Sequence, residues 1–187
     1  MLHPEVLAAP VLMLLDYYLT LYGATLSEKA YGQHFKGGPY EMNPLWQQAV
    51  ANHRWINPRL LALVGCLTAI LVLLSEVPVL DDGSLNALLG FILMPSGLML
   101  GRHVANILTF SHLVRHPGDV SGEVKLSHGF LLSFSIYQLT IVGFPLALVA
   151  VFSPSPFVLG AVAAIPYLAC QYWRWLVRAR RRSTAPV

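Results

Sequence analysis

Long apolar runs separated by short polar segments dominate this chain. Five of these runs are long enough for a helix that crosses a lipid bilayer, which needs about 20 residues. They cover residues 6–26, 60–80, 85–113, 130–152 and 157–177. The pattern predicts an all-α, integral membrane helical bundle of about five transmembrane helices, organised as a single transmembrane domain over residues 1–187.

The segment between the first two runs predicts one further, shorter helix. Asn43-Pro44 supplies a capping residue followed by proline at the first helical position. Apolar side chains after it recur on one face and polar ones on the other, so an interfacial helix over about 44–55 is expected. Asn57-Pro58 repeats the start signal at the beginning of the second span.

Composition agrees with lipid as the main solvent. The 187 residues are 56% hydrophobic and 11% charged, whereas soluble domains carry about 25% charged residues. The net charge of +3 does not indicate nucleic-acid binding, because most basic residues lie just beyond apolar runs. Cys66 and Cys170 both fall inside apolar runs and indicate no disulfide framework.

Basic residues gather in alternate connections between the spans. The first and third connections and the tail hold Lys29, Lys36, Arg54, Arg115, Lys125, Arg174, Arg178, Arg180, Arg181 and Arg182. The other two connections carry no basic residue. Since basic loops stay in the cytoplasm, we expect a multi-pass protein of the bacterial inner membrane with its N-terminus outside and its C-terminus inside. The basic tail over 178–187 is expected to bind anionic lipid headgroups.

Polar side chains inside the spans predict an intramembrane polar cavity open to the cytoplasm. Asp16 and Arg102 lie at similar depths, and an unpaired charge there costs at least ~2.5–3.5 kcal/mol, so an ion pair between them is expected. Buried hydrogen bonds that only hold helices together are the alternative interpretation. The candidate cavity residues are Asp16, Thr20, Glu41, Asn43, Arg102, His103, Asn106 and Tyr137.

The histidines indicate a candidate metal site. His112 and His116 are four residues apart, the spacing that places two imidazoles on one face of a helix. Glu41 and His128 come from segments expected at the same side of the membrane and complete the candidate ligand set. A divalent metal is therefore the cofactor to test, and the sequence indicates no other.

The first quarter of the chain carries a resemblance. Asp16 and Thr20 in the first span, followed by Glu41-Met42-Asn43-Pro44, resemble a group of small prokaryotic polytopic membrane proteins of unassigned function. These proteins share an Asp-x-x-x-Thr span and a Glu-x-Asn-Pro segment. The resemblance implies that Asp16, Thr20, Glu41 and Asn43 belong to one site, and it implies no reaction.

Three classes of function fit these features. The first is a transporter-like or channel-like protein whose cavity handles a polar solute or ion. The second is a membrane-embedded, metal-dependent enzyme that acts on a lipid or lipid-linked substrate, and the third is an accessory subunit of a larger membrane complex. Five spans are few for a transporter, so a homo-oligomer is expected, with Gly160 and Ala164 as one packing face.

The alternation of basic connections gives a testable topology. A reporter that is active only in the cytoplasm, fused after Val187, is expected to be active, because the arginine-rich tail remains inside. The matched fusion, placed after the second span, is expected to be inactive. The opposite pattern of activity would show that the orientation is reversed.

Overall fold

The computed structural model describes residues 4–30, 32, 34–36, 40–76 and 80–183. Five long helices account for most of them: α1 (Pro4–Ala30), α3 (Pro58–Glu76), α4 (Asp82–Arg115), α5 (His128–Phe152) and α6 (Pro156–Ser183). All five are long and apolar enough to cross a membrane. The chain is therefore a multi-pass membrane protein, and the predicted all-α class is confirmed.

Four short elements lie in the connections between the long helices. They are β1 (Phe35–Lys36), α2 (Gln47–Ala51), the 3-10 turn η1 (Pro117–Asp119) and β2 (Val124–Lys125). β1 and β2 pair in parallel, so the connection after α1 is tied to the connection between α4 and α5. This pairing could not be predicted from the sequence, because two residues are too few for a recognisable strand pattern.

The two Asn-Pro signals have different outcomes. Asn57 caps α3 as predicted, since its Oδ1 accepts hydrogen bonds from Arg59 N at 3.1 Å and Leu60 N at 3.4 Å. The helix expected over 44–55 is shorter, and α2 begins only at Gln47. The Oδ1 of Asn43 instead accepts from Leu45 N at 3.1 Å, which makes a local turn where a helix start was expected.

The last helix extends beyond the span predicted to end at residue 177. α6 continues through the basic residues to Ser183, so the tail expected from residue 178 is helical as far as the structure describes it. No glycine or proline interrupts the sequence after Pro166 within this helix, and arginine is a good helix former. Arg174, Arg178, Arg180 and Arg181 consequently lie on a continuous helix.

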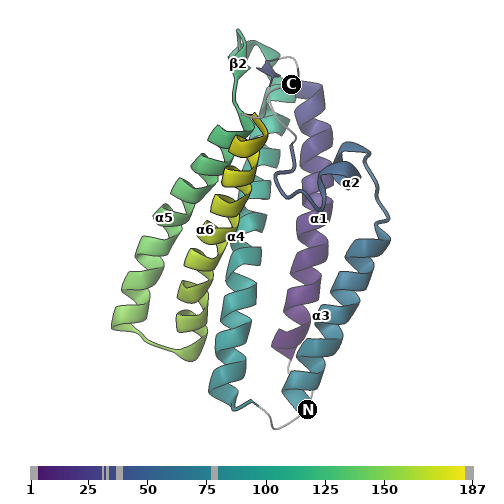
Figure 1. Cartoon of the computed structure of the whole chain (residues 1–187). Helices are drawn as coiled ribbons and strands as arrows, with labels where there is room; N and C mark the ends of the chain where they lie inside the picture. Colours follow the sequence, from purple (N-terminus) through teal and green to yellow (C-terminus); the bar gives the residue numbers. More distant parts are fainter. Residues whose placement is uncertain (1–3, 31, 33, 37–39, 77–79, 184–187) are drawn as a thin grey trace.

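The closest packing between spans follows the order α3, α1, α4, α6, α5 (Figure 1). The start of the connection from α1 to α3, the connection from α4 to α5 and the end of α6 lie toward the upper end of this view, and the first of these connections descends to α2 and the start of α3. The connections from α3 to α4 and from α5 to α6 lie at the lower end. The basic connections thus share one end of the molecule, while its identity as the cytoplasmic end stays a prediction.

Backbone contact without intervening side chains holds α4 against α6. A Cβ atom at Gly90 would overlap the carbonyl oxygen of Phe157, and one at Gly160 would overlap that of Ala87. Ala164 is fully buried within the same chain. The expectation that Gly160 and Ala164 form an oligomer face is therefore wrong, since the small residues are already used inside the protomer.

This crossing predicts different effects of two alanine substitutions on α4. Gly90→Ala should lower the melting temperature of the detergent-purified protein, because a new Cβ meets the α6 backbone and overpacking costs about 1–3 kcal/mol. Gly97→Ala, in open space on the same helix, should leave it unchanged or raise it slightly. Equal melting temperatures for the two variants in a thermal-shift assay contradict the proposed close packing.

Candidate functional site

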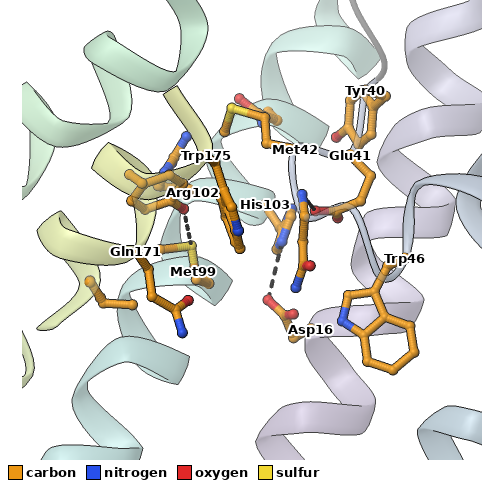
Figure 2. Close-up of a pocket in the computed structure, with 14 residues that line it drawn as sticks. Asp16, Tyr40, Glu41, Met42, Trp46, Met99, Arg102, His103, Gln171 and Trp175 are labelled. Atoms are coloured by element: carbon orange, nitrogen blue, oxygen red, sulfur yellow. Dashed lines mark hydrogen bonds and ion pairs between the residues drawn. The ribbon is translucent and has the colours of Figure 1, made fainter. Parts of the chain in front are cut away.

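A pocket of about 240 Å³ lies between α1, α4, α6 and the segment 40–46 (Figure 2). Six of the eight predicted cavity residues line it: Asp16, Glu41, Asn43, Arg102, His103 and Asn106. A smaller adjoining cavity of about 80 Å³ shares Asp16 and Glu41 with it and is lined in addition by Thr20. Residues from the first span, the first connection and the third span therefore meet at one place.

The imidazole of His103 joins α4 to α1. Its Nε2 lies 3.1 Å from Asp16 Oδ1 and 3.1 Å from Thr20 Oγ1. The Thr20 hydroxyl donates its proton to the Asp16 carbonyl oxygen at 2.8 Å, so its lone pairs can accept a proton from Nε2. The other ring nitrogen, Nδ1, is buried and has no hydrogen-bond partner among the described residues. A bound solute or water in the pocket can meet this need.

The ion pair expected between Asp16 and Arg102 is wrong. Asp16 is paired with His103, and the Nη2 of Arg102 donates instead to Ser135 Oγ on α5 at 3.4 Å. Neighbouring residues on a helix point about 100° apart, so α4 cannot direct both side chains toward α1. Of the ion pairs within the described part of the chain, none includes Arg102.

Glu41 lies on the segment between the spans and faces the same pocket (Figure 2). Its Oε1 accepts a hydrogen bond from Asn43 N at 2.6 Å. Burial raises the pKa of the Glu41 carboxyl, and the charge of Asp16 adds to this effect. The hydrogen bond from Asn43 and the charges of His103 and Arg102 act in the opposite direction. The net effect is a pKa of the Glu41 carboxyl above the ordinary glutamate value.

Aromatic contacts hold the first connection against α1. The Tyr17 hydroxyl donates to Arg54 O at 2.6 Å, and its ring packs edge-on against Trp46 at 6.3 Å between centroids. Tyr18 stacks on Trp55 at 6.1 Å. These two tyrosines follow Asp16 directly in the sequence, so they position the segment that carries Glu41 beside the Asp16 carboxylate.

The α6 wall of the pocket was not predicted from the sequence. Gln171, Tyr172 and Trp175 line it, together with Leu168. Their spacing of three and four residues places them on one helical face, and this periodicity was the available signal.

Tyr137 is the predicted cavity residue that lies outside both cavities. Its side chain is 65% exposed. The buried face of α5 consists of Leu132, Ser135 and Leu139, and Tyr137 projects from another side of that helix. The depth inferred from the sequence gave no information on which way the side chain points, so the expected cavity role is wrong for this residue.

The four predicted metal ligands are not brought together. His112 and His116 are neighbours at the end of α4, and they group with Asp119. Glu41 instead lies in the pocket, because the segment that carries it descends along α1. His128 begins α5 after the capping residue Ser127 and is outside the group. The ligand set as predicted is therefore wrong in two of its members.

Comparisons with protein-family models, with curated proteins and with solved structures find no match to this chain. Its interpretation therefore rests on the geometry of the pocket. In that geometry, Asp16, Glu41 and Asn43 line one cavity and Thr20 contacts His103. These are the residues that the short resemblance at the start of the chain assigned to a single site.

The buried Glu41 predicts a pH-dependent stability. The folded protein keeps the Glu41 proton at pH values where the unfolded chain has lost it, because burial raises the pKa. This stabilisation is complete below the ordinary glutamate pKa and is lost as the pH rises through the raised value. Relative to Glu41→Gln, the wild-type melting temperature should therefore fall as the pH rises.

The control is Glu28→Gln, which changes an exposed glutamate beside His53 at a distance from the pocket. The difference in melting temperature between Glu28→Gln and the wild type should not show the pH dependence expected for Glu41→Gln. Melting curves of wild type and Glu41→Gln that run parallel across the pH range contradict the assignment.

Proposed function

We propose that this membrane protein binds a small polar solute with an anionic group in the pocket and acts as a transporter-like or channel-like unit for it. The observation that supports this is Arg102. Its cationic side chain lines the cavity and donates to the hydroxyl of Ser135, without an ion pair to a carboxylate in the described part of the chain. An anionic ligand supplies the missing charge.

The alternative of a purely structural polar cluster fits this geometry less well. Charges that only hold helices together are expected to pair directly and leave no space between them. Here Asp16 and His103 are in contact, but they and Arg102, Glu41 and Asn106 also line a cavity of about 240 Å³, and Arg102 forms no ion pair within the described part of the chain. The buried Nδ1 of His103 is a further polar atom that this cavity can satisfy.

We infer from the helix lengths that the pocket lies near a membrane boundary. α3 has 19 residues and is about 28 Å long, close to the ~30 Å thickness of the hydrocarbon layer. Leu60, in its first turn, packs with Tyr17 and Leu21 of α1. The neighbouring Asp16 is therefore about level with the start of α3, and the upper parts of α1 and α4 extend beyond the lipid.

Entry of a solute into the pocket from that membrane boundary is consistent with the irregular backbone of residues 40–46. Non-helical backbone at membrane depth is tolerated where it is covered by protein or lines a hydrated cavity, and this segment does both. Under the predicted orientation the pocket opens toward the cytoplasm of a bacterial cell. The helical basic end of α6, with Trp173 and Arg174 exposed, is proposed to contact anionic headgroups.

Glu41 supports a second candidate, a membrane-embedded enzyme acting on a lipid-linked substrate. A carboxyl with a raised pKa close to an imidazole is an arrangement suited to general acid–base chemistry. The separation of Glu41 from His112 and His116 argues against the metal-dependent form of this enzyme. The accessory-subunit class is less favoured, because the polar groups face the pocket and not an outer surface.

Arg102→Gln tests the proposed function. In a thermal-shift screen of small carboxylates and phosphate esters, at least one anion should raise the melting temperature of the detergent-purified wild type. Removing the guanidinium should weaken that binding by about tenfold or more, since a charge-assisted hydrogen bond contributes roughly 1.5–3 kcal/mol.

Arg115→Gln is the matched control, an exposed arginine near the end of the same helix. It should bind the anion as the wild type does. Stabilisation of wild type and Arg102→Gln to the same extent, or by no anion at all, contradicts the proposal. Chemical conversion of a stabilising compound, followed by mass spectrometry, would favour the enzyme instead.

A further inference from the structure

The last turn of α4 and the 3-10 turn after it bring three metal-binding side chains together. His112 Nε2 lies 2.7 Å from Asp119 Oδ2, and the rings of His112 and His116 stack with centroids 4.5 Å apart. One ligand atom from each of the three residues lies within 4.8 Å of the others. All three side chains are exposed to solvent.

The backbone around this cluster fixes the three side chains. His116 N donates to His112 O at 2.9 Å and ends α4, and Asp119 N donates to His116 O at 3.1 Å in the following turn. Pro117 begins that turn and cannot continue the helix. Asp119 is thereby directed back toward the helix end without any long-range contact.

The orientation of His116 leaves a nitrogen available for coordination. Its Nδ1 lies 3.2 Å from the His112 carbonyl oxygen and donates a proton to it. With the proton on Nδ1, the lone pair of the neutral ring is on Nε2. A backbone carbonyl that holds the second ring nitrogen in this way is a common feature of histidine metal ligands.

A simple surface histidine–carboxylate contact does not require this arrangement. His53 and Glu28 provide such a contact in the same protein, at 3.2 and 3.3 Å, and they form no metal-sized group with a further ligand among the described residues. The stacked second imidazole distinguishes the end of α4. Two protonated imidazoles repel each other at this distance, whereas two neutral ones can share a cation.

We propose that His112, His116 and Asp119 bind a divalent transition-metal ion of the zinc class, with water completing its coordination. Two imidazoles and one carboxylate form a set that zinc accepts, and three protein ligands leave a position for solvent. The site is separate from the pocket and does not depend on the proposed transport function.

Zinc binding to the full-length protein, purified without a polyhistidine tag and stripped with chelator, tests the proposal. We expect one zinc per chain by elemental analysis and a higher melting temperature in zinc than in chelator. His112→Ala, His116→Ala and Asp119→Asn should each weaken zinc binding by at least about tenfold in competition with a fluorescent indicator.

His53→Ala is the matched control, because it removes the imidazole beside the Glu28 carboxylate and leaves His112, His116 and Asp119 unchanged. It should retain wild-type affinity for zinc. Melting temperatures measured in chelator establish whether each variant is folded. If the two alanine variants are unfolded, the zinc affinity of Asp119→Asn tests the proposal. The proposal is overturned if the wild type binds no stoichiometric zinc, or if the cluster variants bind it as His53→Ala does.

Discussion

A carboxylate within an apolar helix needs a partner, and a protonated His103 on α4 can be that partner for Asp16, because its Nε2 lies 3.1 Å from Asp16 Oδ1. The contact fixes the rotation of α4 about its own axis. Arg102, one residue earlier, is then directed toward α5 and α6, where it reaches Ser135. Two adjacent residues of α4 therefore face different neighbours, His103 toward α1 and Arg102 toward α5. Asp16 and Arg102 form no ion pair with each other, and both line the pocket.

The remaining walls depend on two different kinds of packing. Gly90 and Gly160 let the backbones of α4 and α6 meet, which sets Tyr172 and Trp175 opposite the segment that carries Glu41. That segment has no regular structure, so its polar groups find local partners, as in the bond from Asn43 N to Glu41. The wall formed by α6 is therefore held by backbone packing against α4, whereas the wall formed by residues 40–46 is held by side-chain contacts.

Periodicity and hydropathy were sufficient to predict the five spans and the cap at Asn57, because both follow from local chemistry. They also predicted six of the eight residues expected in the cavity, which line one pocket. They could not predict which neighbouring helix or surface each side chain faces, which explains the errors at Arg102 and Tyr137. Descent of the first connection along α1 depends on long-range contacts of Tyr17, which no local pattern encodes.

Under the proposed placement of the pocket near a membrane boundary, the histidine cluster lies beyond the hydrocarbon layer on the same side. α4 has 34 residues, about 51 Å, and cannot be contained in a hydrocarbon layer of ~30 Å. His112 is nine residues, roughly 13 Å, beyond His103 along that helix. Pairing of β1 with β2 then joins the loop after the cluster to the connection that leads into the pocket segment. The two proposed sites share no residue, and α4 and the β1–β2 pairing are the backbone elements that link them.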